Sequence, residues 1–330
     1  MIATVPMQAA LVPTFRESRH VVAFFLRQLR KATGIGKLMN LVPLFDSMSP
    51  GRTGRTWCRN FKSAALAFAA VSFALAAHAE DASPWQRDGH SAVRLLAGSR
   101  SGVVLLGGVA FQLQPGWHTY WRTPGDSGVP PRFDFSKSDN IEAVTVLWPA
   151  PQKFDDGAGG FSLGYHDQLV LPLRIVAKNA EKPVTLRADI NYAVCEHICI
   201  PVEASAELAI NNVASTEDSV LFAALDTVPK PANVGDPNPL TIRDVKRTGK
   251  SEVLVDVVTP DARAVNLFVE GPTPDWGLPV PKLVDNGPQG VKRFSFQLDG
   301  VPPGINPAGA ALKFTLVGGD RSYEFNINLD

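Results

Sequence analysis

The chain has 330 residues and balances 32 basic against 32 acidic side chains. The balance is uneven: residues 1–79 hold 10 basic and 2 acidic side chains, so residues 80–330 have 22 against 30 and a net charge of −8. A mildly acidic chain without a basic stripe excludes nucleic acid as a partner, and the 251 residues after position 79 are enough for two domains of ordinary size.

The first 79 residues have the pattern of a leader for export. Basic residues at 52–62 precede an apolar run at 63–77 that is too short to span a bilayer comfortably. Ala77-His78-Ala79 fits the small-x-small cleavage rule, so we expect a cleaved signal peptide and a periplasmic mature chain from Glu80. The residues before about position 50 fit no ordinary signal peptide. We therefore expect an over-extended start, with Met48 as the candidate, or alternatively an uncut N-terminal anchor.

Residues 80–212 are predicted to form one β-sandwich. Short runs of strand-forming residues alternate with Gly/Pro turns such as 114–116 and 123–128, and no amphipathic helix of useful length interrupts them. This pattern predicts an all-β fold of immunoglobulin-like type. The predicted strands are 91–97, 102–114, 117–122, 132–136, 141–148, 168–177, 184–194 and 200–210.

The last two of these strands carry a pair of cysteines at their junction. Apolar and polar residues alternate along 184–194 and again along 200–210, and Cys195 and Cys199 fall in the polar register, so we expect both to point away from the core and to be exposed. The loop between the cysteines is Glu196-His197-Ile198. Such a loop places them opposite one another, about 4.5–5.5 Å apart between Cα atoms, which is within disulfide range.

Three interpretations of this pair are open. A redox couple fits the exposure and the spacing, because an exported pair stays oxidised unless something reduces it. A structural disulfide closing so small a ring would add only about 2 kcal/mol of stability, on which a domain of this size does not depend. A copper or zinc site with His197 as the third ligand lacks the second pair of ligands that structural zinc sites have. We favour the redox couple, with no cofactor and no metal.

Two residues are expected to support the pair because they are adjacent to it. A protonated His197 would lower the pKa of a neighbouring thiol, whereas Glu196 would raise it. The sequence leaves open which effect is larger.

Other candidates for support lie further away in the sequence. Tyr120, in the aromatic run 117–121, either shields the disulfide or packs in the sheet. The glycine-rich stretch Asp155–Phe161 is either a cover over the cysteines or a plain turn, and Tyr165 begins a Tyr-His-Asp turn that either tunes the thiols or is only solvated. Tyr192, just before the cysteines, completes the predicted supporting residues.

The remainder of the chain is predicted to be a linker followed by a second, smaller β-sandwich. In the linker, 213–237, residues 215–218 look like a helix start, Leu221 lies on its apolar face, and prolines from Pro229 onward end it. Residues 238–330 have no cysteine, no histidine and no dense polar cluster, so their work is expected to be packing, spacing or partner contact. The predicted strands are 240–247, 252–258, 265–270, 279–285, 291–298, 310–317 and 322–329.

Four ordered motifs carry a resemblance to a known family. Together they are similar to the periplasmic N-terminal domain of DsbD-type thiol:disulfide interchange proteins, and most similar to the ScsB-like branch. The resemblance covers about residues 90–210, and more loosely the two-sandwich arrangement of the rest. The motifs are GWHTYWRTPGDSGVPP at 116–131, WPAPQKF at 148–154, GYHDQLVLPL at 164–173 and YAVCEHICIP at 192–201.

The resemblance implies an immunoglobulin-like domain with a redox-active disulfide, a component of a protein-disulfide reductase. In the family, the pair receives electrons from a membrane-embedded domain and passes them to periplasmic thioredoxin-fold proteins, such as disulfide isomerases or copper-resistance thiol proteins, in cytochrome c biogenesis and copper tolerance. Cys195 and Cys199 match the family's redox pair, and the second cysteine is the one that family members expose to the partner. The Asp155–Phe161 stretch sits where the family has a cap, although here it is glycine-rich and lacks the carboxylate–aromatic cluster.

Family members continue into a multi-helix membrane domain and a thioredoxin-like domain, neither of which occurs up to Asp330. We therefore expect a separate membrane protein as electron donor and a monomeric chain. A non-catalytic periplasmic binding module with a structural disulfide is the alternative function.

Overall fold

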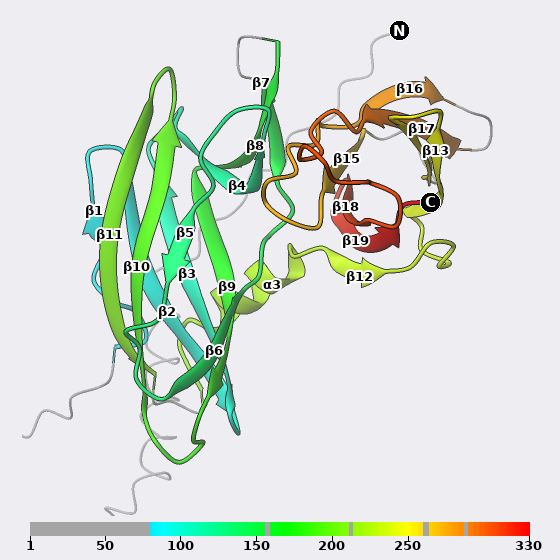
Figure 1. Ribbon diagram of the computed structural model, residues 1–330. Coiled ribbons are helices and arrows are strands. Elements are labelled where there is room, and N and C mark those ends of the chain that lie inside the picture. The colour runs from blue at the N-terminus through cyan, green and yellow to red at the C-terminus, as the bar shows by residue number, and fades with distance from the viewer. Residues whose placement is uncertain (1–79, 156–158, 211–213, 260–263, 287–289) are drawn as a thin grey trace, which may run out of the picture. The chain divides into compact units, whose positions relative to one another are not determined.

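The computed structural model describes residues 80–155, 159–210, 214–259, 264–286 and 290–330, and it consists almost entirely of β-strands (Figure 1). The predicted all-β fold is confirmed, whereas the predicted leader and start lie outside the described residues. In these ranges no helix is long and apolar enough to cross a membrane. The elements are β1 Gln86–Arg87, β2 Ser91–Ser101, β3 Val104–Leu113, β4 His118–Gly125, β5 Arg132–Asp134, β6 Ile141–Val146, β7 Gln152–Asp155, β8 Phe161–His166, β9 Gln168–Ala177, β10 Val184–Cys195, β11 Cys199–Ile210, α3 Asp218–Asp226, β12 Lys230–Ala232, β13 Thr241–Thr248, β14 Glu252–Val258, β15 Val265–Glu270, β16 Lys282–Asn286, β17 Val291–Gln297, β18 Ala311–Gly318 and β19 Arg321–Asn328.

The first eleven strands form a two-sheet sandwich. One sheet has the order β1-β2-β3-β9-β6, and the other has the order β11-β10-β4-β8-β7 with β5 paired to β10. Alternate residues of the strands face inward, so the two sheets share one apolar core. Leu95 and Leu171 contribute to that core from the first sheet, and Leu186 and Ile190 contribute from the second.

The hairpin β10–β11 is the longest paired element of this sandwich. Its register runs without a shift from Val184↔Ile210 to Cys195↔Cys199, which agrees with the predicted strands to within one residue at the loop. The period of two residues explains the agreement, because a slip by one residue would turn the whole apolar face of a strand outward.

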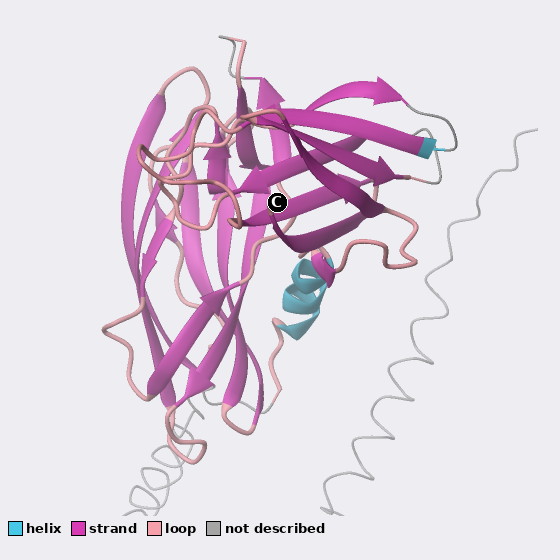
Figure 2. Ribbon diagram, turned by 45° about the vertical axis from the view of Figure 1, so that its right-hand side comes forward, coloured by secondary structure: helices cyan, strands magenta, loops and turns pink. Residues whose placement is uncertain are grey.

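The segment after β11 lies against the first sandwich and then joins the second. Helix α3, drawn in cyan in Figure 2, inserts Leu221 fully buried against Leu96 of β2 and Ala110 of β3. The Asp218 side chain accepts a backbone hydrogen bond from Ser99 at 2.7 Å, which attaches the first turn of the helix to β2. Strand β12 then pairs in parallel with β19, so the stretch predicted as a linker contributes to both sandwiches.

The second sandwich has two four-stranded sheets, with the orders β12-β19-β18-β15 and β13-β14-β17-β16. Its core contains Phe314 and Phe325 from the first of these sheets and Val255 and Phe294 from the second. The predicted strands of this region match the observed ones closely, because their alternation is regular and Gly-containing turns separate them.

Four short strands were not predicted: β1, β7, β8 and β12. The pair β7–β8 matters most, because it supplies the sheet that lies beside β4. Strand β8 contains Gly164, which lowers its strand propensity, and β7 is only four residues long. Both strands form because they pair with one another and with β4, which is an effect of tertiary structure.

Candidate functional site: the disulfide at the end of β10

Cys195 and Cys199 form a disulfide at the junction of β10 and β11. They are the last paired residues of the hairpin and their Cα atoms lie 4.2 Å apart, with Glu196-His197-Ile198 as the connecting loop. The sequence thus places the two sulphur atoms together through the strand register, without a contribution from a distant segment.

The two cysteines differ in exposure. Cys199 is exposed, whereas Cys195 is only 3% exposed and packs with Tyr120 and Ala193 in a small cluster separate from the main core. The expectation that both would be exposed was therefore wrong for Cys195. The residue does face away from the main core, but a side chain from β4 covers it. One sulphur of the bond is thus available to a partner and the other is sheltered.

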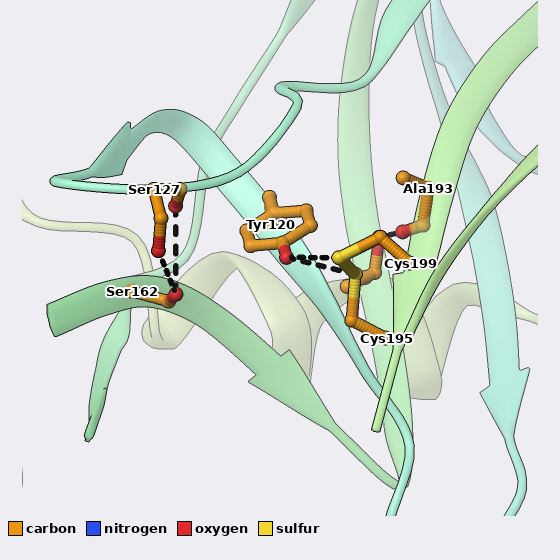
Figure 3. The surroundings of a disulfide bond; sticks show 7 residues. Tyr120, Ser127, Ser162, Ala193, Cys195 and Cys199 are labelled. Carbon is orange, nitrogen blue, oxygen red and sulfur yellow. Dashed lines mark hydrogen bonds between the residues drawn. A yellow bond between two sulfur atoms is a disulfide. The ribbon is translucent and has the colours of Figure 1, made fainter. Parts of the chain in front are cut away.

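That covering side chain is Tyr120. Its hydroxyl donates a hydrogen bond to Cys195 Sγ at 2.8 Å and lies 3.1 Å from Cys199 Sγ, as Figure 3 shows. The ring is only 3% exposed, and burial raises the pKa of the hydroxyl. The group therefore keeps its proton at neutral pH, so it is available as a donor to sulphur in either redox state.

Two contacts hold Tyr120 in this position. Strand β4 pairs with the end of β10, where Thr119 Oγ1 donates to the carbonyl of Ala193 at 2.9 Å. On the other side, Gly128 lies against the tyrosine ring: a Cβ at this position would be 2.3 Å from Tyr120 Cε1, and the backbone φ is +127°. Only glycine fits such a close approach at that backbone angle. The Gly128 turn is therefore part of the site.

An aromatic group that was not predicted lies beside Tyr120. His118, two residues before it on the same face of β4, packs edge-on to the Tyr120 ring and stacks on Phe154 of β7, with ring centroids 5.4 and 5.2 Å apart. Phe154 also meets His166 of β8 edge-on. The period of two residues from Tyr120 to His118 was a signal in the sequence, but Phe154 depends on the unpredicted pair β7–β8.

Three of the residues that were predicted to support the cysteine pair make their contacts away from the cysteines. Tyr165 is in the main core, and its hydroxyl donates to the carbonyl of Pro149 at 2.8 Å. Tyr192 faces the core and shares a hydrogen bond of 2.7 Å with Ser91 Oγ. Phe161 lies over the amine of Lys153, and among the described contacts none joins Phe161 to either cysteine. Residues 156–158 of the predicted cap lie outside the described residues.

The loop residues Glu196 and His197 are exposed beside the pair. The Glu196 carboxylate lies against the turn at Gly116, where a Cβ would be 2.7 Å from Oε1. Their predicted opposite effects on the thiol pKa stay a prediction. In the described ranges, no three His, Cys, Asp or Glu side chains are grouped so that they could hold a metal ion.

The far end of β4 carries an ion-pair network that was not predicted either. Arg122 contacts Glu270 of β15 at 2.7 Å and Glu324 of β19 at 2.6 Å, and Thr123 also donates to Glu270. Burial opposes the charge of Arg122, but the hydrogen bonds and charges of the two glutamates outweigh it and raise the arginine pKa. Strand β4, which covers the disulfide, is thus also joined to the carboxylates of Glu270 and Glu324 in the second sandwich.

These features define an immunoglobulin-like sandwich that presents a half-covered disulfide at a hairpin end. Residues 100–210 match the family described as the N-terminal domain of thiol:disulfide interchange protein DsbD. The resemblance inferred from the four motifs is therefore confirmed over residues 100–210, which match a DsbD-type N-terminal domain. No curated protein matches the chain.

Two solved structures are similar to differing degrees. The N-terminal periplasmic domain of ScsB from Proteus mirabilis has a TM-score of 0.62 and 22% sequence identity, with 76% of this chain and 98% of that chain covered. This likeness shows the fold, and its coverage is too large for the first sandwich alone. A conserved domain protein from Bacillus anthracis has a TM-score of 0.22 and 10% identity over 71% of this chain and 75% of that chain. This TM-score is too low to indicate a shared fold.

Proposed function

We propose that the Cys195–Cys199 pair relays electrons by dithiol–disulfide exchange in the periplasm, from a membrane-bound donor to thioredoxin-fold proteins. The observation that carries the proposal is the asymmetry of the pair: Cys199 is exposed, whereas Cys195 is sheltered under Tyr120. Exchange through a mixed disulfide needs one sulphur that a partner can reach and a second that stays near it. A purely structural bond has no need of this difference.

The exchange transfers two electrons to the partner in two steps. In the reduced pair, the Cys199 thiolate attacks one sulphur of the partner's disulfide, and the partner's other sulphur leaves as a thiolate. The Cys195 thiolate then attacks Cys199 Sγ, so the mixed disulfide breaks and the Cys195–Cys199 bond forms. Two electrons have passed to the partner, whose two thiolates take up protons, and the membrane donor later reverses the change in the pair.

Two further observations support this proposal. The family that residues 100–210 match is described as a thiol:disulfide interchange protein, and the similar ScsB domain is described as periplasmic. Tyr120 contributes a hydroxyl donor that stabilises a thiolate better than a neutral sulphur, because hydrogen bonds to ions are the stronger ones.

The test measures the reduction potential of the pair against glutathione or dithiothreitol, in a Cys58→Ser background because Cys58 would also react. We expect a value among the thioredoxin-like exchangers, about −270 to −120 mV. A pair that stays oxidised below about −300 mV would identify a structural disulfide and overturn the proposal.

A trapping experiment tests the direction of attack. Cys195→Ser leaves the exposed Cys199 free, so we expect it to accumulate a mixed disulfide with an oxidised thioredoxin-fold protein. Cys199→Ser leaves only the sheltered Cys195 and should trap far less. Equal trapping by both variants contradicts the assignment of Cys199 as the attacking residue.

A further inference from the structure

A row of four reactive side chains crosses the sheet at the disulfide. Cys199 pairs with Cys195, Cys195 pairs with His118, and His118 pairs with His166, on the adjacent strands β11, β10, β4 and β8. Directly paired residues of antiparallel strands point to the same face, with Cβ atoms about 4.5–5.5 Å apart. His118 is therefore the imidazole next to Cys195 on the face of the sheet that carries the disulfide.

His118 is held there without a hydrogen bond at one nitrogen. Its Nε2 atom is buried and has no hydrogen-bond partner among the described residues, while the ring is fixed between Phe154 and Tyr120. A buried polar atom without a partner is unfavourable. Reduction of the disulfide leaves a thiol on Cys195, the residue paired with His118, and this thiol is a donor that the nitrogen lacks in the oxidised state.

We propose that His118 accepts the proton of the Cys195 thiol in the step that resolves the mixed disulfide. This inference rests on the proposed function and names the residue that makes its second step fast. The proton passes from Cys195 Sγ to His118 Nε2. The Cys195 thiolate attacks Cys199 Sγ, the bond from Cys199 to the partner breaks, and the electron pair leaves on the partner's sulphur. The imidazolium then gives its proton to that thiolate or to water.

The sheltered position of Cys195 explains why this step needs a base. Cys195 is 3% exposed, so water has little access to its proton, and burial disfavours a thiolate. Tyr120 only donates to Cys195 Sγ and keeps its own proton, so it stabilises the thiolate without taking the proton. His118 supplies the function that Tyr120 lacks.

The surroundings keep His118 in the neutral form that a base needs. Burial lowers its pKa below the ordinary value of 6.5. The titratable groups on the packed elements are Tyr120 on β4, His166 on β8 and Cys195 on β10, while β7 contributes the neutral ring of Phe154. The charged groups nearest in sequence to these have other partners: Asp167 pairs with His166, the Lys153 amine lies over Phe161, and Glu196 lies against Gly116.

The experiment follows the reaction of the reduced chain with 5,5′-dithiobis(2-nitrobenzoate), again in the Cys58→Ser background. Attack by Cys199 releases one coloured thiolate, and resolution by Cys195 releases a second, so the two steps appear as two phases of equal size. A thiol with a pKa of about 8.5 is only about 3% ionised at pH 7, which limits the benefit of a base to about thirtyfold. We expect His118→Phe, which keeps an aromatic ring, to slow the second phase about tenfold while the first changes less than about twofold.

The pH profile separates a proton acceptor from a packing residue. With His118 present, the rate of the second phase should level off once the imidazole is neutral. In His118→Phe the rate should instead keep rising until the thiol itself ionises, at about pH 8.5 or above.

Two variants complete the design. His118→Gln keeps a polar side chain without a basic nitrogen, and it carries the test if the phenylalanine variant folds poorly; it should behave like His118→Phe. His166→Phe replaces the next histidine in the row, which is half-exposed and paired with Asp167, and it should leave both phases unchanged. An unchanged second phase in both His118 variants overturns the role of His118 while exchange itself stands. A wild-type chain with no second phase overturns the proposed function as well.

Discussion

Two hairpins in this chain have the same loop length and different chemistry. In the first sandwich, β10 and β11 are joined by the three residues between Cys195 and Cys199; in the second, β13 and β14 are joined by the three between Thr248 and Glu252. The second hairpin turns at Gly249, whose φ is +65°, with open space around it. The first has no residue with positive φ in its loop, and a disulfide joins its last pair.

The larger difference is the neighbouring strand. The closing pair Thr248↔Glu252 is followed across the sheet by Gln297 of β17, whereas β4 places Tyr120 and His118 beside Cys195. Two cysteines at the end of any hairpin would be equivalent by their local geometry. In this site they become unequal because β4 covers one of them, so the chemistry of the hairpin depends on residues about 75 positions earlier in the chain.

The largest loss of stability should come from substitution of Arg122, which joins β4, the strand that distinguishes the two hairpins, to the second sandwich. Arg122→Met leaves the Glu270 carboxylate without its cation, while Glu324 keeps only its longer ion pair with Lys313 at 3.4 Å. Removing one partner of such a largely buried pair costs about 3 kcal/mol. Denaturant unfolding should show this loss. Lys137→Met, which breaks an exposed ion pair with Asp189, is the control and should leave the midpoint unchanged. Equal midpoints for the two variants would mean that the network contributes nothing.

A matched pair of glycine substitutions distinguishes the two hairpins. Gly249→Ala meets no neighbour and should cost only about 1 kcal/mol, for its positive φ. Gly128→Ala has a positive φ and also collides with the Tyr120 ring, so it should cost about 2 kcal/mol. It should also speed reduction of the disulfide by dithiothreitol, because Tyr120 no longer covers Cys195. If both variants are reduced at the wild-type rate, Gly128 is not part of the cover.

The hydroxyl of Tyr120 should have a smaller, purely chemical effect. Tyr120→Phe keeps the ring and removes the hydrogen bond to Cys195, which corresponds to about 1 kcal/mol or about a fivefold loss of thiolate. Alkylation of the reduced pair as a function of pH should show the thiol titrating at a higher pH. Tyr165→Phe is the control, since it removes a buried hydroxyl that is bonded to the carbonyl of Pro149 and has no sulphur partner, and its alkylation profile should match the wild type.

The smallest effect on exchange is expected for Tyr192→Phe, because that hydroxyl faces the core. Burial raises the pKa of Tyr192 to about 12, so the fold favours the neutral phenol. Its contribution to stability is therefore complete below the ordinary value of 10.0 and is lost as the pH rises from there to about 12. Across that pH range, the midpoint temperature of thermal unfolding should fall more steeply for the wild type than for Tyr192→Phe. A changed exchange rate in the variant would contradict the placement of this hydroxyl away from the cysteines.

Much of the fold could be predicted because its strands are regular. The register of β10–β11, and with it the position of the disulfide, follows from alternation and loop length. The same alternation assigns Tyr192 to the core along with Ile190 and Val194, so the alternation conflicts with the prediction that Tyr192 supports the cysteines. What could not be predicted was the cover of Cys195, because it requires knowing that β4 pairs with the end of β10.

The aromatic group beside Tyr120 shows the same limit. His118 lies two residues from Tyr120 and therefore on its face, yet its packing depends on Phe154 in β7. That strand forms only by pairing with β8, whose sequence contains a glycine and a short apolar run. Local strand propensity does not predict such pairing. His118, the residue that we assign to proton transfer, was therefore outside the predicted site.

The unbroken register of β10–β11 also has a consequence for how the disulfide forms during folding. The hairpin pairs twelve residues of one strand with twelve of the other, and Cys195 meets Cys199 only at the end of the correct alignment. In a hairpin shifted by one residue, the cysteines would no longer face one another, and the bond would not close. Closure of this disulfide therefore depends on the correct alignment of the two longest strands of the first sandwich, and the first oxidation of the pair fixes that alignment.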